Sequence, residues 1–385
     1  MSKSRVIIVT LSEPYAFGHV SGRWYYVLLK ELSRRGYEVR CLSVTTNQEW
    51  ARLALDAVRP FGVRLSLYPL SQGGNWLSRK WRTFRRPFSY SLSDSLRRDL
   101  ATEIRTGYDV LHLEQLWAGY LAEKLPRTLV SVHHLGALDL RNLKQGPWPD
   151  LRSRLLIRSE ASLLRKLDAM STLSNRLAES IQSINNRARV FVVPFGVDPS
   201  LYSFTKEDRV EEPTIGFMAN LRWMPGYLAA KRLLSCVFPM VKRSVPNAKV
   251  LIAGWGAREA LPEFANEPDV TIAGDVPLAQ AYFERLQVLA YPVPQGSGVK
   301  VKVLEAMAWG IPVVTTSDGV EGIKAISGEH CFVADEDNLF AGKIIEVLRD
   351  LELRRRLRKC ARALVEAQHS PIPVVNRVEQ IYRVL

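Results

Sequence analysis

Residues 296–305, Gly-Ser-Gly-Val-Lys-Val-Lys-Val-Leu-Glu, combine a glycine turn with two lysines and a glutamate. A helix is predicted from about Val299 to Trp309, so the turn presents backbone N–H groups at a positive helix end, which is a phosphate site. Lys300 and Lys302 lie in the first turn, where the helix dipole disfavours cations, and therefore indicate that an anion meets them. Glu305 lies where a carboxylate can accept both ribose hydroxyls; the alternative is an exposed glutamate in ordinary ion pairs.

A second set of polar side chains follows two predicted strands of the first half. His133 and His134 lie at the carboxyl end of the predicted strand Thr128–His133, and His112 and Glu114 lie at the end of the preceding strand. Because parallel strands end at one edge of a sheet, we expect these side chains to point toward the same site.

The elements that position these residues alternate between short apolar strands and helical patterns, which is typical of βαβ units. In the first half, strands are predicted at Val6–Leu11, Glu38–Val44, Val110–Leu113, Thr128–His133 and Val190–Val193, with helices near Arg23–Arg34 and Leu151–Ile184. In the second half, they are predicted at Thr214–Met218, Ala248–Ala253, Val270–Ala273, Val288–Pro292, Pro312–Thr316 and Cys331–Ala334, with helices between them and at Leu351–Gln368 and Val374–Leu385.

This pattern predicts an α/β fold of two Rossmann-like, doubly wound domains facing one another across a cleft. We assign residues 1–195 to an N-terminal acceptor-side domain, 196–212 to a linker, 213–368 to a C-terminal nucleotide-binding domain, and 369–385 to a helix packing back toward the N-terminal domain. Such sheets bind ligands beyond the carboxyl ends of their strands.

The amino-acid composition indicates where the protein works and which ligands it binds. The run Val6–Leu11 is too short for a secretory signal or a membrane span, and the four scattered cysteines suit a reducing compartment, so a cytoplasmic location is expected. Neither His-Glu-x-x-His nor Asp-x-Asp occurs, so no metal and no cofactor is expected. Residues 1–200 hold 30 Lys and Arg against 17 Asp and Glu, whereas residues 201–385 hold 23 against 22. The basic half suggests an anionic partner, but no nucleic-acid-binding motif accompanies it.

The run from Gly296 to Val314 resembles the donor-binding signature of family 4 glycosyltransferases, which have the GT-B fold, in their Gly-Ser-Gly-x-x-x-Lys-x-Leu-Glu-Ala subgroup. The resemblance extends to the loop Pro14–Gly22, to Phe195–Asp198, to Gly216–Pro225 and to Pro246–Gly254. It implies a metal-independent hexosyltransferase that moves a sugar from a nucleotide diphosphate donor, UDP- or GDP-sugar, to a hydroxyl acceptor with retention, in glycan, polysaccharide or glycolipid assembly. The nucleotide-sugar is then a co-substrate.

The resemblance also implies roles for single residues. It assigns the catalytic site to His133, Lys302 and Arg222, and donor binding to Gly296, Ser297, Gly298, Val299, Lys300, Glu305 and Gly18. Three positions depart from the family: Phe195 stands where the motif has an asparagine, Ser297 stands where many members have a sugar-binding glutamate, and Leu228 stands where a lysine is expected. Lys302, or less suitably Lys231, would supply that missing charge.

Three other functions remain open. A nucleotide-sugar epimerase would convert donor without acceptor, a natural-product glycosyltransferase would use a soluble aglycone, and a non-catalytic protein would only bind the nucleotide-sugar. The acceptor side is assigned to His134, Glu114, Arg82, Arg85 and Arg86. His134 serves only to orient its loop in one interpretation, and Glu160 with Arg158 forms a surface ion pair in another.

The stretch from Gly73 to Gly107 interleaves cations with Trp76, Trp81, Phe84 and Phe88. Aromatic and basic residues together suit the headgroup region of an anionic membrane, so peripheral binding at the inner face and a lipid-linked acceptor are expected. A solvated loop that meets a sugar or another small acceptor is the alternative.

Overall fold

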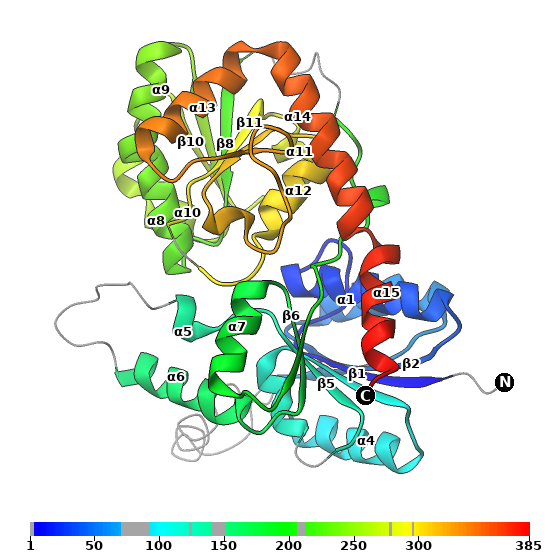
Figure 1. Cartoon of the computed structure of the whole chain (residues 1–385). Helices are drawn as coiled ribbons and strands as arrows, with labels where there is room; N and C mark the ends of the chain where they lie inside the picture. Colours follow the sequence, from blue (N-terminus) through cyan, green and yellow to red (C-terminus); the bar gives the residue numbers. More distant parts are fainter. Residues whose placement is uncertain are drawn as a thin grey trace. The chain divides into compact units, whose positions relative to one another are not determined.

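The computed structural model describes residues 4–70, 92–122, 125–139, 151–205, 212–276, 279–294 and 296–385 (Figure 1). The chain divides into two compact units. The first consists of residues 1–197 together with 371–385, and the second of residues 198–370.

The first unit contains a seven-stranded parallel sheet in the order β3-β2-β1-β4-β5-β6-β7. Its strands are β1 Arg5–Thr10, β2 Glu38–Thr45, β3 Arg64–Pro69, β4 Val110–Glu114, β5 Thr128–Val132, β6 Ala169–Thr172 and β7 Arg189–Val192. Its described α-helices are α1 Val20–Arg34, α2 Gln48–Val58, α4 Asp94–Arg105, α5 Gly136–Asp139, α6 Leu151–Leu164, α7 Asn175–Ile184 and α15 Pro371–Tyr382.

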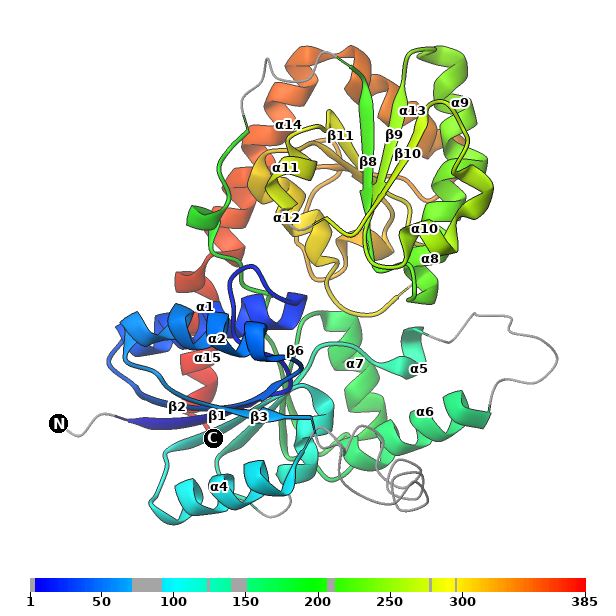
Figure 2. The same ribbon diagram turned by 180° about the vertical axis from the view of Figure 1, so that it is seen from behind.

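Helices cover both faces of this sheet (Figures 1 and 2). Leucines of α4, α6 and α7 pack with Ile7, Leu111, Val130 and Met170 in one core. Helices α1, α2 and α15 lie on the other face, and α15 packs against α1 although it follows the whole second unit in sequence. Strands covered on both faces are normally apolar throughout. Polar residues at alternating positions of β4 are therefore unusual.

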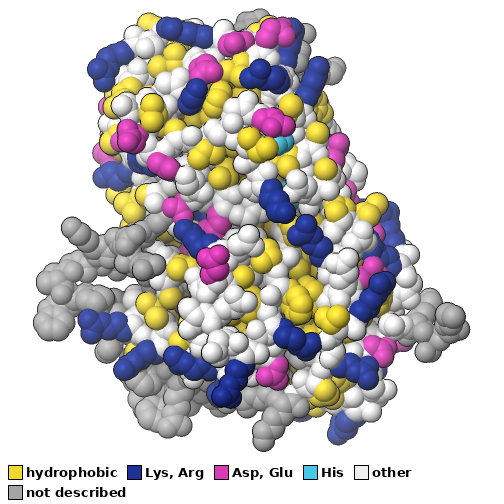
Figure 3. Space-filling view, in the orientation of Figure 1, with side chains coloured by type: hydrophobic (Ala, Val, Ile, Leu, Met, Phe, Trp, Pro, Cys, Tyr) yellow, Lys and Arg dark blue, Asp and Glu magenta, His cyan; other side chains and the backbone are white. Residues whose placement is uncertain are grey.

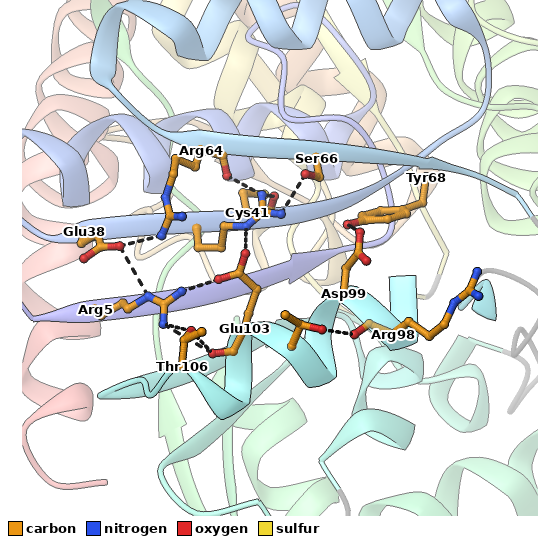
Figure 4. Close-up of polar contacts among 12 residues, drawn as sticks. Arg5, Glu38, Cys41, Arg64, Ser66, Tyr68, Arg98, Asp99, Glu103 and Thr106 are labelled. Atoms are coloured by element: carbon orange, nitrogen blue, oxygen red, sulfur yellow. Dashed lines mark hydrogen bonds and ion pairs between the residues drawn. The ribbon is translucent and has the colours of Figure 1, made fainter. Parts of the chain in front are cut away.

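Ion pairs link side chains near the amino-terminal ends of strands β1, β2 and β3 (Figure 4). Glu103 of α4 accepts a hydrogen bond from Arg40 Nε at 2.6 Å and another from Arg5. Burial alone would raise the pKa of Glu103, but Arg40 and Arg5 together lower it. Arg64 pairs with Glu38 at 2.6 Å. Part of the positive charge of the first half is thus neutralised inside the fold, at the sheet edge opposite the strands' carboxyl ends.

The second unit contains a six-stranded parallel sheet in the order β10-β9-β8-β11-β12-β13. Its strands are β8 Thr214–Met218, β9 Lys249–Ala253, β10 Val270–Gly274, β11 Val288–Tyr291, β12 Val313–Thr315 and β13 Phe332–Val333. Its described α-helices are α8 Met224–Arg232, α9 Phe238–Ser244, α10 Ala257–Ala260, α11 Ala279–Phe283, α12 Val301–Trp309, α13 Asp337–Arg349 and α14 Leu351–Leu364. Single π-helical segments follow α8 and α14, at Leu233–Val237 and Val365–His369.

The predicted α/β class with two doubly wound domains is confirmed, but one predicted element is wrong. The single long helix at Leu151–Ile184 is two helices, α6 and α7, with the buried strand β6 between them. The helix at the glycine turn begins at Val301 and not at Val299, with Lys300 as its N-cap residue. Within the described residues, no helix combines the length and the apolar character that crossing a bilayer requires.

Candidate functional site

Each sheet has a point at which the strand order reverses, where open α/β sheets bind ligands beyond the strands' carboxyl ends. In the second unit this point lies between β8 and β11, and in the first between β1 and β4. Most of the described residues singled out from the sequence lie at or beside one of these two edges. Each edge has its own set of charged and polar side chains.

In the second unit, the loop from β11 to α12 forms the predicted glycine turn. Gly296 and Gly298 have φ values of 147° and 77°, which favour glycine. The buried Lys300 donates hydrogen bonds to the carbonyl oxygens of Gly298, at 2.7 Å, and Gly296, at 3.4 Å. Because a trans peptide turns its N–H opposite to its C=O, the N–H groups of Ser297 and Val299 point away from Lys300. Lys300 therefore stabilises the turn from the side opposite to these N–H groups.

Lys302 and Glu305 form an ion pair on α12, with 2.8 Å between Nζ and Oε2. The carboxylate of Glu305 is buried, and its Oε1 accepts a hydrogen bond from the Tyr202 hydroxyl at 3.3 Å. Glu305 is therefore not the exposed surface glutamate of the alternative interpretation. Each carboxylate oxygen has two lone pairs and can accept more than one hydrogen bond.

Arg222 lies in the loop after β8 and is exposed. Its guanidinium stacks on the ring of Trp255, 4.4 Å from the centroid, and Trp255 is itself 51% exposed at the end of β9. Gly256 makes this arrangement possible, because a Cβ at that position would lie 2.8 Å from Arg222 Cγ. Arg222 thus presents a fixed cation at the carboxyl edge of the sheet. Lys231 instead lies between the Tyr227 ring and Glu263 on the surface.

In the first unit, Glu114 ends β4 with its carboxylate fully buried. Oε2 lies 2.8 Å from His133 Nε2, while Oε1 accepts a hydrogen bond from Trp24 Nε1 at 3.0 Å and lies 3.2 Å from His112 Nε2. Burial alone would raise the pKa of Glu114, but His112, His133 and Trp24 outweigh it and lower that pKa. An ionised carboxylate thus orients the ring of His133, which is 11% exposed.

The other predicted residues of the first unit have more ordinary surroundings. His134 is exposed. The N–H of Gly18 donates to the Tyr15 carbonyl at 3.1 Å, and its carbonyl accepts from Arg23 Nε at 2.9 Å. Glu160 is buried and accepts hydrogen bonds from the N–H groups of Gly136 and Ala137, at 2.8 and 3.1 Å, so it caps the start of α5. Burial raises the pKa of Glu160 to about 7.

Three predicted acceptor-side residues, Arg82, Arg85 and Arg86, lie outside the described residues. The sequence alone did not indicate Trp24, Tyr202 and Trp255. Each of them contacts its charged partner, Glu114, Glu305 and Arg222 respectively, only once the chain has folded. In the part of the chain that the structure describes, no three His, Cys, Asp or Glu side chains gather as a metal site.

Comparison with known proteins gives two matching families. Residues 21–201 match the sequence model described as "Glycosyltransferase Family 4", and residues 212–350 match that of "Glycosyl transferases group 1". A Klebsiella pneumoniae protein named "Uncharacterized 44.6 kDa protein in cps region" is 34% identical over 145 residues. That match covers 35% of this chain, and the chain spans only 37% of the length of this curated relative.

Several solved structures share the fold across the whole chain. Sucrose-phosphate synthase from Thermosynechococcus elongatus has a TM-score of 0.72 at 16% identity, covering 99% of this chain and 98% of that one. Anabaena HepE in complex with UDP and glucose has a TM-score of 0.69 at 13% identity, covering 99% and 100%. The TarM structure has a TM-score of 0.72 at 10% identity, covering 99% of each chain. The chain is a member of glycosyltransferase family 4, with the two-domain GT-B fold.

Proposed function

We propose that this protein is a hexosyltransferase that moves a sugar from a UDP-sugar to a hydroxyl group of an acceptor. The observation that carries this proposal is the glycine turn of the second unit, which is braced by Lys300 and followed on α12 by Lys302 and Glu305. We choose UDP over GDP because solved structures of the same fold hold UDP, glucose and UDP-glucose in HepE, and UDP in TarM.

The second unit would supply the electrostatic part of the reaction. N–H groups of the turn, Lys302 and Arg222 would stabilise the departing diphosphate, and such stabilisation commonly lowers the barrier more than any other effect of the protein. Glu305 would accept the ribose hydroxyls. We propose that these cations, and not a divalent metal, neutralise the developing charge. The leaving phosphate would then accept the acceptor's proton, which gives retention of configuration.

The first unit would supply the sugar side. His133, held by Glu114 at 2.8 Å, would contact the transferred sugar, and Gly18 would take part in donor binding. A ring with a fixed orientation favours one geometry of the reacting groups, which lowers the entropic part of the barrier.

Calorimetry with UDP, GDP, ADP and TDP tests the nucleobase, and we expect UDP to bind most tightly. Mass spectrometry of reactions with UDP-sugars and candidate hydroxyl acceptors tests transfer, and NMR of the product gives its anomeric configuration. Conversion of donor without acceptor would favour an epimerase. Binding of UDP without turnover of any donor would favour a non-catalytic protein. Preference for GDP would correct the donor assignment.

We also propose that the first unit meets an anionic membrane that presents a lipid-linked acceptor. Within the described residues, Arg154 and Arg158 of α6 and Arg165, just after it, are exposed. Figure 3 shows several dark blue side chains over this part of the first unit. Each basic residue near an anionic lipid surface contributes about 1 kcal/mol. Lys and Arg outnumber acidic residues in the first 200 positions by 30 to 17, which supports this choice of partner.

Sedimentation with vesicles tests this contact. We expect binding to anionic but not to neutral vesicles, with loss at high salt and in a variant in which Arg154, Arg158 and Arg165 are alanine. A matched variant that removes Arg243, Arg356 and Lys359, three exposed cations of the second unit, should still bind. A wild-type protein that does not sediment with anionic vesicles at low salt would favour a soluble acceptor.

A further inference from the structure

A row of polar side chains crosses the face of the first sheet that α1 and α15 cover. His112 of β4, Ser131 of β5 and Ser171 of β6 occupy it, with 2.8 Å between His112 Nε2 and Ser131 Oγ, and 2.9 Å between the two serine oxygens. All three side chains are buried. Neighbouring residues on the same strands point into the opposite, apolar core. Burying polar side chains in a sheet that helices cover on both faces costs desolvation free energy, so each of these side chains needs a hydrogen-bond partner.

The last helix of the chain completes this row. The hydroxyl of Tyr382 in α15 lies 2.7 Å from His112 Nδ1, and both side chains are buried. Burial raises the pKa of Tyr382 well above its usual value, so the phenol keeps its proton. Burial likewise lowers the pKa of His112, although Glu114 opposes this, so the ring is neutral near pH 7.

The partners of His112 fix which ring nitrogen carries the proton. A neutral imidazole has one N–H donor and one acceptor. Nε2 lies 2.8 Å from Ser131 Oγ and 3.2 Å from the ionised Glu114. A proton on Nε2 bonds to the serine oxygen and is attracted by the nearby carboxylate, so the proton belongs on Nε2. Nδ1 is then the acceptor, and the Tyr382 hydroxyl donates to it. If the ring changed tautomer, the lone pair of Nε2 would lie against the carboxylate of Glu114.

We propose that Tyr382 is a positioning residue for His133. Its hydroxyl bonds to Nδ1 of His112, Nε2 of His112 lies 3.2 Å from Oε1 of Glu114, and Oε2 of Glu114 bonds to Nε2 of His133. This inference rests on the proposed function only where it gives His133 a part in sugar transfer. It extends the site to the C-terminal helix, 249 positions beyond His133 in the sequence.

Arg35 fixes the helix that carries the tyrosine. Its side chain pairs with both Glu31 and Glu379 and donates to the Asn376 side chain and to the Ile372 carbonyl. These contacts join the C-terminal end of α1 to α15. The ring of Tyr37 also meets the ring of Tyr382, with 6.4 Å between centroids.

The test is Tyr382→Phe in the full chain, with Tyr37→Phe as the matched control. Both changes remove one phenol oxygen from the interface of α15, but only Tyr382 contacts His112. In Tyr382→Phe we expect kcat to fall roughly tenfold to a hundredfold, with an unchanged dissociation constant for UDP. Nitrogen-15 spectra of labelled histidine should show His112 losing its single tautomer, and the ring signals of His133 should shift. Tyr37→Phe should change neither kcat nor these signals.

Unchanged kcat and unchanged His133 signals in Tyr382→Phe would overturn the proposal, even if the variant melts at a lower temperature. If this variant does not fold, His112→Gln takes its place, since its amide still donates toward Glu114 but offers Tyr382 no ring nitrogen. The ring signals of His133 should shift in His112→Gln, and unshifted signals would overturn the proposal. If the wild type transfers no sugar, the proposed function fails, and the histidine spectra still decide whether Tyr382 positions His133.

Discussion

The ammonium group of Lys302 lies 2.8 Å from Oε2 of Glu305, one turn further along α12. Because Glu305 is buried, Lys302→Ala would remove the ammonium group that is paired with its carboxylate. We expect the variant to melt at a lower temperature and to lose roughly a hundredfold to a thousandfold in kcat/KM, the range for removal of one preorganised electrostatic contact. Melting curves and steady-state kinetics with a UDP-sugar measure the two effects.

Lys343→Ala is the control for this prediction. Lys343 and Glu346 form another lysine–glutamate pair at the same spacing, 2.7 Å apart, but both side chains are about 40% exposed. Exposed pairs of this kind contribute about 0.5 kcal/mol or less. Wild-type kcat/KM in Lys302→Ala would contradict our assignment of the donor site.

Gly256→Ala should weaken sugar transfer through Arg222. The residue has a φ of 77°, and its new Cβ would lie 2.8 Å from Arg222 Cγ, so the guanidinium must leave its position over Trp255. The left-handed backbone alone costs about 1–2 kcal/mol. Gly328→Ala has a similar φ of 85° and nothing within 4 Å of the new Cβ, so it isolates this backbone cost. Equal transfer rates in both variants would show that the position of Arg222 does not matter.

Glu160 should make the first unit less stable as the pH rises toward neutrality. Its pKa is about 7 in the fold, against 4.5 for the ordinary side chain, so the folded state binds the proton more tightly. The stabilisation is complete below about pH 4.5 and is lost as the pH rises through about 7, a change of up to about 3 kcal/mol. Unfolding of wild type and Glu160→Gln between pH 4.5 and 8 measures it. A constant difference between the two proteins across this range would contradict the prediction.

Glu114 should show the opposite pH dependence. Its pKa is lowered in the fold, so its stabilisation is present above the ordinary pKa and is lost as the pH falls through the lower folded value. Glu114→Gln should therefore flatten the acid side of the curve of stability against pH.

Glu114→Gln should also depress kcat far more than UDP binding, because the carboxylate orients His133. We expect the same result for His133→Ala. Unchanged turnover in both variants would return His133 to a structural role.

The fold could be predicted from the sequence where the hydrophobic pattern was unambiguous. The strands of both sheets are short apolar runs between helices, and most were predicted to within one or two residues. Two strands of the first sheet, β3 and β6, were not predicted. β6 was missed because Ala-Met-Ser-Thr has only four residues, and so short a run cannot be told from part of a helix by periodicity.

The candidate site was predictable only in part. The glycine turn and α12 are contiguous in sequence, so Lys302 and Glu305 could be placed on one helix. The contacts of Glu114 with Trp24, 90 positions away, and of His112 with Tyr382, 270 positions away, could not. One signal for them was present: Leu-His-Leu-Glu places polar residues on one face of a strand that should be apolar on both.

Because α15 belongs to the first unit but follows the second unit in sequence, the first unit can be completed only at the end of translation of these residues. The first unit holds residues from both ends of the described chain, so translation of its first 197 residues leaves α1 without the helix that covers it. Val374, Val375, Val378 and Ile381 of α15 are buried in the finished unit, and Tyr382 arrives with them. The entire second unit must therefore be synthesised before His112 can form its hydrogen bond with the Tyr382 hydroxyl. A chain that stops before Pro371 would lack this contact, however well its second unit folds.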